Sequence, residues 1–181
     1  MSCRQAAGAR GALGIPAGEG GSMRIGILSD THDNMPLIQR ACELFNSREV
    51  ELVLHCGDYV APFSLNPLNQ ILKSDYVGVF GNNDGEQKGL QRIAQGKIRP
   101  SPAEFTIGRW QVLVAHELAH PDTAAGKAYR LVAYGHTHRP EVQRKGDTLI
   151  VNPGECGGWL YNRSTVAIAD LDALEAEIIE L

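Results

Sequence analysis

The chain has 181 residues, of which 43% are hydrophobic and 21% charged, and its formal net charge is -4. A chain of this length can bury a substantial core within one domain. The acidic balance argues against a nucleic-acid surface that depends on bulk positive potential. No apolar run approaches the roughly 20 residues that cross a bilayer. We therefore expect no membrane partner, and nucleic acid only as a possible substrate.

The four cysteines are far apart in the chain and form no Cys-x-x-Cys pair. Their spacing predicts neither a structural zinc site nor a redox motif. Cys42, Cys56 and Cys156 lie in or beside apolar stretches. Reduced, semi-buried thiols are typical of the cytoplasm, and we expect a cytoplasmic protein.

Residues 1–22 are rich in Gly and Ala and contain no aromatic residue. Such a segment cannot bury enough apolar area to fold, and its apolar core is too short for a signal peptide. We expect a disordered tail or leader over residues 1–22. Residues 23–181 then form a single domain that begins at Met23.

Three apolar runs in the first half predict buried strands, at residues 23–28, 50–54 and 76–80. Each run ends in a polar cluster. Strands that alternate with helices up to about Gln95 predict parallel β-α-β units. In such sheets, ligands bind beyond the carboxyl ends of the strands.

Two helices are expected between these strands. The first begins at Pro36, because apolar residues recur after it at steps of three and four. The second is expected at residues 62–72, where Pro67 should break or kink it.

Shorter β patterns follow Gly96 and predict a second sheet, more antiparallel than the first. A short helix is expected at residues 121–127. The expected strands are residues 104–107, 110–114, 131–134, 141–144, 148–151, 164–171 and 175–181. Short turns predict hairpins between the first two of these strands and between the fourth and fifth.

Five of the predicted strands end in residue types that bind metal ions. These residues are Asp30 with His32, Asp58, Asn82, His116, and His136 with His138. Each has a plainer interpretation, since Asp caps helices, Asn suits tight turns, and a single His can belong to the core. Independent caps and turns do not predict the joint pattern.

Seven ligands are too many for one catalytic ion, but they divide between two ions that share a carboxylate. Asp58 stands alone in its turn, without a companion histidine. We therefore expect Asp58 to bridge the two ions.

The chain closely resembles the calcineurin-like metallophosphoesterases in five segments, which follow in the family's order. These segments are residues 29–32 (Ser-Asp-Thr-His), 57–58 (Gly-Asp), 81–84 (Gly-Asn-Asn-Asp), His116 and 135–138 (Gly-His-Thr-His). The Gly-Asn-Asn-Asp-Gly-Glu segment at residues 81–86 and the Asn-Pro-Gly turn at 152–154 are similar to the small prokaryotic cytosolic phosphodiesterases. The resemblance runs from Met23 to about Glu155. It implies an α/β fold, the four-layer α-β-β-α sandwich in which helices flank two packed, mostly mixed β-sheets.

The resemblance also implies the ligand sets and the activity. One ion would take Asp30, His32, Asp58 and His138, and the other Asp58, Asn82, His116 and His136. The implied activity is a dinuclear, metal-dependent phosphodiesterase in which a hydroxide between the ions attacks a small phosphate diester. The mixed nitrogen and oxygen ligands suit manganese, which we expect first, and also nickel, iron or zinc.

The sequence departs from the family at two positions. Many members have a His, taken as the proton donor to the leaving group, where this chain has Asn83, and an amide cannot donate a proton as an acid. This departure favours substrates with good leaving groups, or a proton donor from elsewhere, such as metal-bound water. The second departure is Leu118, which replaces a polar residue of the family's pocket wall.

Asp58, Asn83 and Asp84 are the catalytic candidates, with Asp84 expected to orient Asn82 or Asn83 through a hydrogen bond. His120 is either a replacement proton donor or a surface histidine. His55 is expected to be a core or supporting group.

Arg139 is either a phosphate contact or a solvated residue.

Three functional alternatives share the same sequence pattern. One is a protein-binding scaffold of the same fold, like the retromer subunit that resembles this family. The others are a phosphomonoesterase and a nuclease. The sequence does not choose the substrate or the oligomeric state, and a homo-oligomer stays open.

Overall fold

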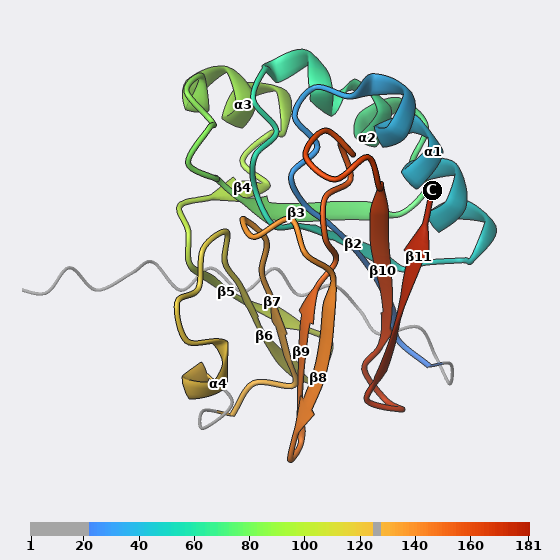
Figure 1. Cartoon of the computed structure of the whole chain (residues 1–181), viewed down its shortest axis with the longest axis vertical. Coiled ribbons are helices and arrows are strands. Elements are labelled where there is room, and N and C mark those ends of the chain that lie inside the picture. The colour runs from blue at the N-terminus through green and yellow to red at the C-terminus, as the bar shows by residue number, and fades with distance from the viewer. Residues whose placement is uncertain (1–21, 125–127) are drawn as a thin grey trace, which may run out of the picture.

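The structure is a computed structural model that describes residues 22–124 and 128–181 (Figure 1). The tail predicted at residues 1–22 therefore lies outside the described residues, apart from Ser22. The helix predicted at residues 121–127 is represented by α4, Pro121–Ala124, and the rest of that segment is not described.

The first sheet has six strands in the order β11-β10-β1-β2-β3-β4. Its strands are β1 Arg24–Leu28, β2 Leu52–His55, β3 Asp75–Val79, β4 Ile98–Arg99, β10 Thr165–Asp170 and β11 Glu175–Glu180. Strands β1 to β4 are parallel, as the alternation of strands and helices predicts. The first three begin within two residues of their predicted positions, whereas the two-residue β4 was not predicted.

The prediction that the closing strands belong to the second sheet is wrong. β10 pairs antiparallel with β1, and β11 pairs antiparallel with β10, so both extend the first sheet. The reason is that β10 is apolar on both faces. Val166 and Ile168 pack on the helical side, while Ala167 and Ala169 pack into the core between the sheets. A strand buried on both faces suits a position beside the parallel strands.

The second sheet has five strands in the order β5-β6-β7-β9-β8. Its strands are β5 Ala103–Ile107, β6 Trp110–Val114, β7 Leu131–Ala133, β8 Glu141–Lys145 and β9 Thr148–Asn152. The predicted hairpins β5–β6 and β8–β9 are both present and antiparallel. β7 is parallel to β6 and to β9, which makes this sheet mixed.

The helices α1 Met35–Ser47, α2 Asn66–Gln70 and α3 Gln87–Ile93 cover the outer face of the first sheet (Figure 1). The break predicted at Pro67 is confirmed, because a 3-10 helix at Pro62–Leu65 ends just before α2 begins. Pro67 lies in the first turn of α2, where its missing N–H removes no helical hydrogen bond.

These elements form the predicted sandwich. Within the described ranges, the helical layer beside the second sheet consists of α4 alone. Aliphatic side chains from both sheets meet in a shared core between them. Cys42, Cys56 and Cys156 are buried free thiols. No helix in the described part of the chain is long and apolar enough to cross a membrane.

Candidate metal centre

Five loops, which follow β1, β2, β3, β6 and β7, carry the predicted ligands. Two of the loops are joined by backbone hydrogen bonds, from Asp30 N–H to Gly57 C=O at 3.0 Å and from His32 N–H to Asp58 C=O at 3.1 Å. Five of the seven candidates have a positive φ, namely Asp30, His32, Asp58, His136 and His138. Non-glycine residues adopt this conformation at a cost, and such residues gather at functional sites.

Asp30, His32 and His138 form one cluster. Asp30 Oδ1 lies 3.3 Å from His138 Nε2 and 3.9 Å from His32 Nε2. His32 Nε2 also lies 3.6 Å from Asp58 Oδ2. Three candidate ligands from the β1 and β7 loops therefore face one another, with Asp58 beside them.

A second cluster adjoins the first on the other side of Asp58. His116 Nε2 lies 3.4 Å from Asp58 Oδ2. Asn82 Oδ1 lies 2.8 Å from His116 Nε2 and 2.9 Å from His136 Nδ1. The structure thus brings all seven predicted residues together, with the Asp58 carboxylate between the two groups.

The donor atoms fit divalent metal ions. Among the described residues, the buried Asp30 Oδ1 and His32 Nε2 have no hydrogen-bond partner, although buried polar atoms normally have one. Two groups of these ligand atoms lie within 4.8 Å of one another, Asp30–His32–His138 and Asp30–Asp58–His116. A cation would satisfy the orphaned atoms.

The sequence of residues 23–174 matches the calcineurin-like phosphoesterase superfamily domain. The chain belongs to the calcineurin-like phosphoesterase superfamily. A phosphodiesterase of Methanocaldococcus jannaschii is 36% identical over 168 residues, which cover 88% of this chain and 99% of the relative. These matches support phosphoesterase activity, and the family implies divalent metal ions.

Solved structures agree with this assignment. An archaeal phosphodiesterase superposes with a TM-score of 0.80 at 36% identity, covering 88% of this chain and 100% of that one. Vps29 of Entamoeba histolytica, solved with Zn²⁺, superposes with a TM-score of 0.62 at 15% identity, covering 88% of this chain and 98% of that one. The second similarity concerns the fold alone.

In this phosphoesterase the ring of His116 is held by a hydrogen bond at its second nitrogen, Nδ1. His116 Nδ1 lies 2.9 Å from the carbonyl oxygen of Cys56, which can only accept, so Nδ1 carries the proton. The other nitrogen, Nε2, faces Asp58 Oδ2 and Asn82 Oδ1, and it would be the atom that coordinates a bound metal ion. Burial tends to lower the pKa of His116, but the hydrogen bond with Asp58 and the charges of Asp58 and Asp30 outweigh it and raise the pKa above its usual value.

Asn83 holds the Asp58 carboxylate. Its backbone N–H donates to Asp58 Oδ1 at 2.8 Å, and its Nδ2 donates to Asp58 Oδ2 at 2.7 Å. Burial tends to raise the pKa of Asp58, but hydrogen bonds from His116 and Asn83 outweigh it and keep the pKa below its usual range. A Cβ on Gly81 would overlap Asp58 Oδ1 and lie 2.5 Å from Asp58 N, so this loop position requires glycine.

The hydrogen-bond partners expected for Asp84 are wrong. Its carboxylate bonds no Asn side chain, but accepts from the backbone N–H groups of Gly81 at 2.7 Å, Val60 at 2.8 Å and Asp58 at 3.1 Å. Burial raises the pKa of Asp84. Asp84 therefore ties the β3 loop to the β2 loop and positions Asp58 through its backbone.

His55 is a supporting group, as expected. Its Nδ1 accepts a hydrogen bond from Gly57 N–H at 3.1 Å, so its Nε2 carries the proton and donates to Thr31 Oγ1 at 3.2 Å. The Thr31 hydroxyl donates in turn to Asp58 C=O at 3.2 Å. Burial lowers the pKa of His55 to about 3. A neutral imidazole thus joins the loops that carry Asp30 and Asp58.

Sequence reasoning missed Glu155 and Asn152. Glu155 is buried, and its Oε2 lies 3.3 Å from His138 Nδ1. Asn152 Nδ2 donates to Gly135 C=O at 3.1 Å and to Thr137 Oγ1 at 3.0 Å. Both residues follow or end an apolar strand, which is the same signal that identified the other candidates, but the segment was interpreted only as a turn.

The remaining candidates lie at the edge of the centre. Leu118 packs against the apolar cluster on the second sheet, which explains an apolar residue at this position. His120 is exposed. Arg139 is also exposed, and its guanidinium lies 5.8 Å from the centroid of the Tyr161 ring.

Proposed function

We propose that this phosphoesterase is a dinuclear phosphodiesterase that hydrolyses small phosphate diesters with two divalent ions, manganese first. One observation carries the proposal. All seven candidate ligands converge from five loops. Asp58 Oδ2 lies between the two clusters, 3.6 Å from His32 Nε2 and 3.4 Å from His116 Nε2.

The two clusters define the proposed ligand sets. Asp30, His32 and His138 would hold one ion together with Asp58. The second ion would be held by Asp58 and by three residues that contact one another, Asn82, His116 and His136. The two histidines of the β7 loop would then serve different ions.

Bound ions of this kind polarise the phosphate and activate water for attack on phosphorus. The protein supplies fixed geometry. Asn83 and Asp84 hold Asp58 from two sides, and His55 links the loop of Asp30 to that of Asp58. Because the Asn83 amide cannot donate a proton as an acid, we propose that substrates have good leaving groups.

The test is hydrolysis of bis(para-nitrophenyl) phosphate with added Mn²⁺. We expect activity in the wild type and its loss in Asp58→Ala. Asp147→Ala is the matched control, because Asp147 is exposed in the turn between β8 and β9, at the opposite end of β9 from Asn152. Equal rates in the wild type and Asp58→Ala would contradict the proposal.

The alternatives give different results in the same preparation. A protein-binding scaffold predicts less than one bound ion under saturating Mn²⁺ and no hydrolysis. A phosphomonoesterase predicts faster cleavage of para-nitrophenyl phosphate than of the diester. A nuclease predicts that an oligonucleotide is cut much faster than either.

A further inference from the structure

Three large apolar side chains are exposed in a row between β9 and β10. Trp159 and Leu160 are each 65% exposed and Tyr161 is 52% exposed. Scattered apolar residues on a surface need no explanation, but consecutive ones, two of them aromatic, mark an interaction site.

The loop is fixed against the metal centre. Trp159 Nε1 donates to His32 C=O at 3.2 Å. The Glu155 carboxylate accepts from Trp159 N–H at 2.7 Å and from Leu160 N–H at 3.0 Å, while Glu155 Oε2 faces His138. The indole is therefore held beside the backbone of His32, and Glu155 ties its loop to His138, so little freedom is lost when the indole binds a partner.

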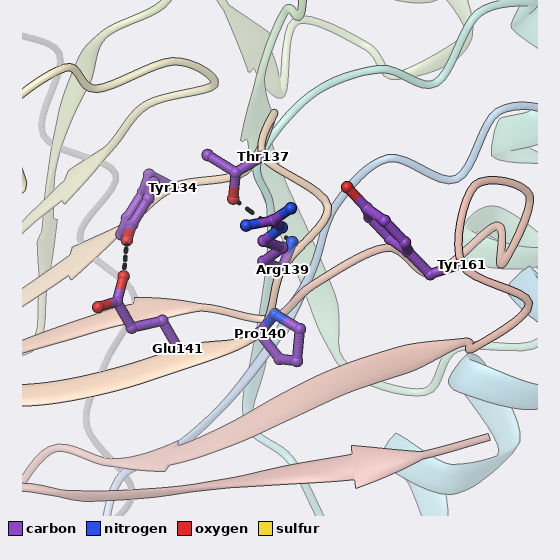
Figure 2. A pocket seen from close by; sticks show the side chains of 6 residues that line it. All are labelled: Tyr134, Thr137, Arg139, Pro140, Glu141 and Tyr161. Atoms are coloured by element: carbon purple, nitrogen blue, oxygen red, sulfur yellow. Dashed lines mark hydrogen bonds between the residues drawn. The ribbon is translucent and has the colours of Figure 1, made fainter.

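A pocket of about 570 Å³ adjoins this loop (Figure 2). It is lined by Tyr134, Thr137, Arg139, Pro140, Glu141 and Tyr161. Because Thr137 and Arg139 flank His138 in the chain, the pocket begins at the metal-centre loop. Its volume lies within the range that small-molecule sites occupy.

Two charged residues line the pocket, the carboxylate Glu141 and the cation Arg139. The Glu141 carboxylate accepts hydrogen bonds from the Tyr134 hydroxyl and from Gln143. Arg139 is the cation that lines the pocket, and it lies over the Tyr161 ring. In a chain of net charge -4, a cation at this position attracts an anion locally.

We propose that Trp159 and Tyr161 form a stacking platform for the planar base of a nucleotide-type diester, whose phosphate reaches the metal centre past Arg139. This inference rests on the proposed phosphodiesterase function and names its substrate class. Every nucleobase offers a π face, so aromatic stacking selects bases over aliphatic groups without a particular sequence.

The test compares two diesters that release the same para-nitrophenolate, thymidine para-nitrophenyl phosphate and methyl para-nitrophenyl phosphate. The ratio of their kcat/KM values cancels changes in metal loading and leaving-group chemistry. We expect Trp159→Ala and Tyr161→Ala each to reduce the preference for the thymidine ester by about fivefold or more. Tyr161→Phe keeps the ring and should keep the preference. Ile93→Ala removes an exposed apolar side chain on α3 and should leave both rates unchanged.

The possible results distinguish the stacking platform from the phosphodiesterase function on which it rests. If the wild type cleaves both esters and the ratio is unchanged in both alanine variants, the platform is wrong while the phosphodiesterase function stands. If the wild type cleaves neither ester with Mn²⁺, both are wrong. If sedimentation shows a dimer that Trp159→Ala dissociates, with the ratio unchanged, the loop binds a second copy of the chain and the platform is again wrong.

Discussion

Glu155 Oε2 lies 3.3 Å from Nδ1 of His138, while Nε2 of the same ring lies 3.3 Å from Asp30 Oδ1. The imidazole is therefore placed between two buried carboxylates. Ligand histidines commonly give one nitrogen to the metal and the other to a carboxylate, which fixes the ring and raises its basicity. Glu155 is thus a positioning residue for His138.

Glu155→Gln should weaken Mn²⁺ binding, because it removes the buried negative charge that lies 3.3 Å from His138 Nδ1. Loss of such a partner typically costs about 10- to 100-fold in metal affinity. Isothermal titration of the metal-free protein measures the change. Glu175→Gln is the matched control, because Glu175 is exposed on the edge strand β11. Unchanged Mn²⁺ affinity in Glu155→Gln would show that Glu155 does not position His138 for metal binding.

Gly135→Ala should disturb Asp30. An added Cβ would overlap Ser29 Oγ and lie 2.8 Å from Asp30 Oδ2. Overpacking of this kind costs about 1–3 kcal/mol in the free energy of unfolding, and displacement of Asp30 should also lower Mn²⁺ affinity. Gly85→Ala is the control, since its Cβ would meet nothing within 4 Å. Denaturant unfolding should show a loss for Gly135→Ala alone, and equal stabilities would contradict the packing described here.

Asn83→His should change the dependence of rate on the leaving group. The Asn83 side chain contacts Asp58 and is exposed, so an imidazole there can reach a departing oxygen. General acid catalysis helps poor leaving groups most. The slope of log kcat against leaving-group pKa, measured over a series of aryl methyl phosphates, should become shallower in the variant. A slope identical to that of the wild type would show that proton donation does not depend on this position.

His55 should make the metal-free protein sensitive to acid. Its pKa is about 3 in the fold because of burial, whereas a solvated histidine titrates near pH 6.5. Between these values only the unfolded chain binds the proton, so the stability present above about pH 6.5 is lost progressively as pH falls toward 3.

His55→Gln removes this titration. At pH 4.5, two units below the solvated pKa, protonation of this histidine in the unfolded chain lowers the free energy of unfolding by about 2–3 kcal/mol. The fall in unfolding free energy between pH 7 and pH 4.5 should therefore be smaller in the variant by roughly that amount. Urea unfolding in the presence of a chelator measures it. Parallel pH profiles for the two proteins would contradict a buried, neutral His55.

The sequence predicts the strands of the first half and their ligands because one local pattern, an apolar run ending in Asp, Asn or His, marks both. Asp30, Asp58 and Asn82 meet because parallel strands share a carboxyl edge. The place of β10 is not predictable in this way. Its partner β1 lies more than a hundred residues earlier, and its two apolar faces suit either sheet.

Supporting residues are harder to predict than ligands. Asp84 accepts hydrogen bonds from backbone N–H groups, which have no residue-specific signature. Glu155 acts across the fold on His138 and on the Trp159 loop. Long-range pairings of this kind depend on tertiary packing rather than on local spacing.

The most direct test of the two-ion centre is a titration of metal-free protein with Mn²⁺ while diester hydrolysis is followed. A dinuclear centre predicts no hydrolysis in chelator, and a rate that rises with added Mn²⁺ and reaches its plateau at two equivalents. Full activity in chelator, or a plateau at one equivalent, would contradict a centre in which Asp58 joins two ions.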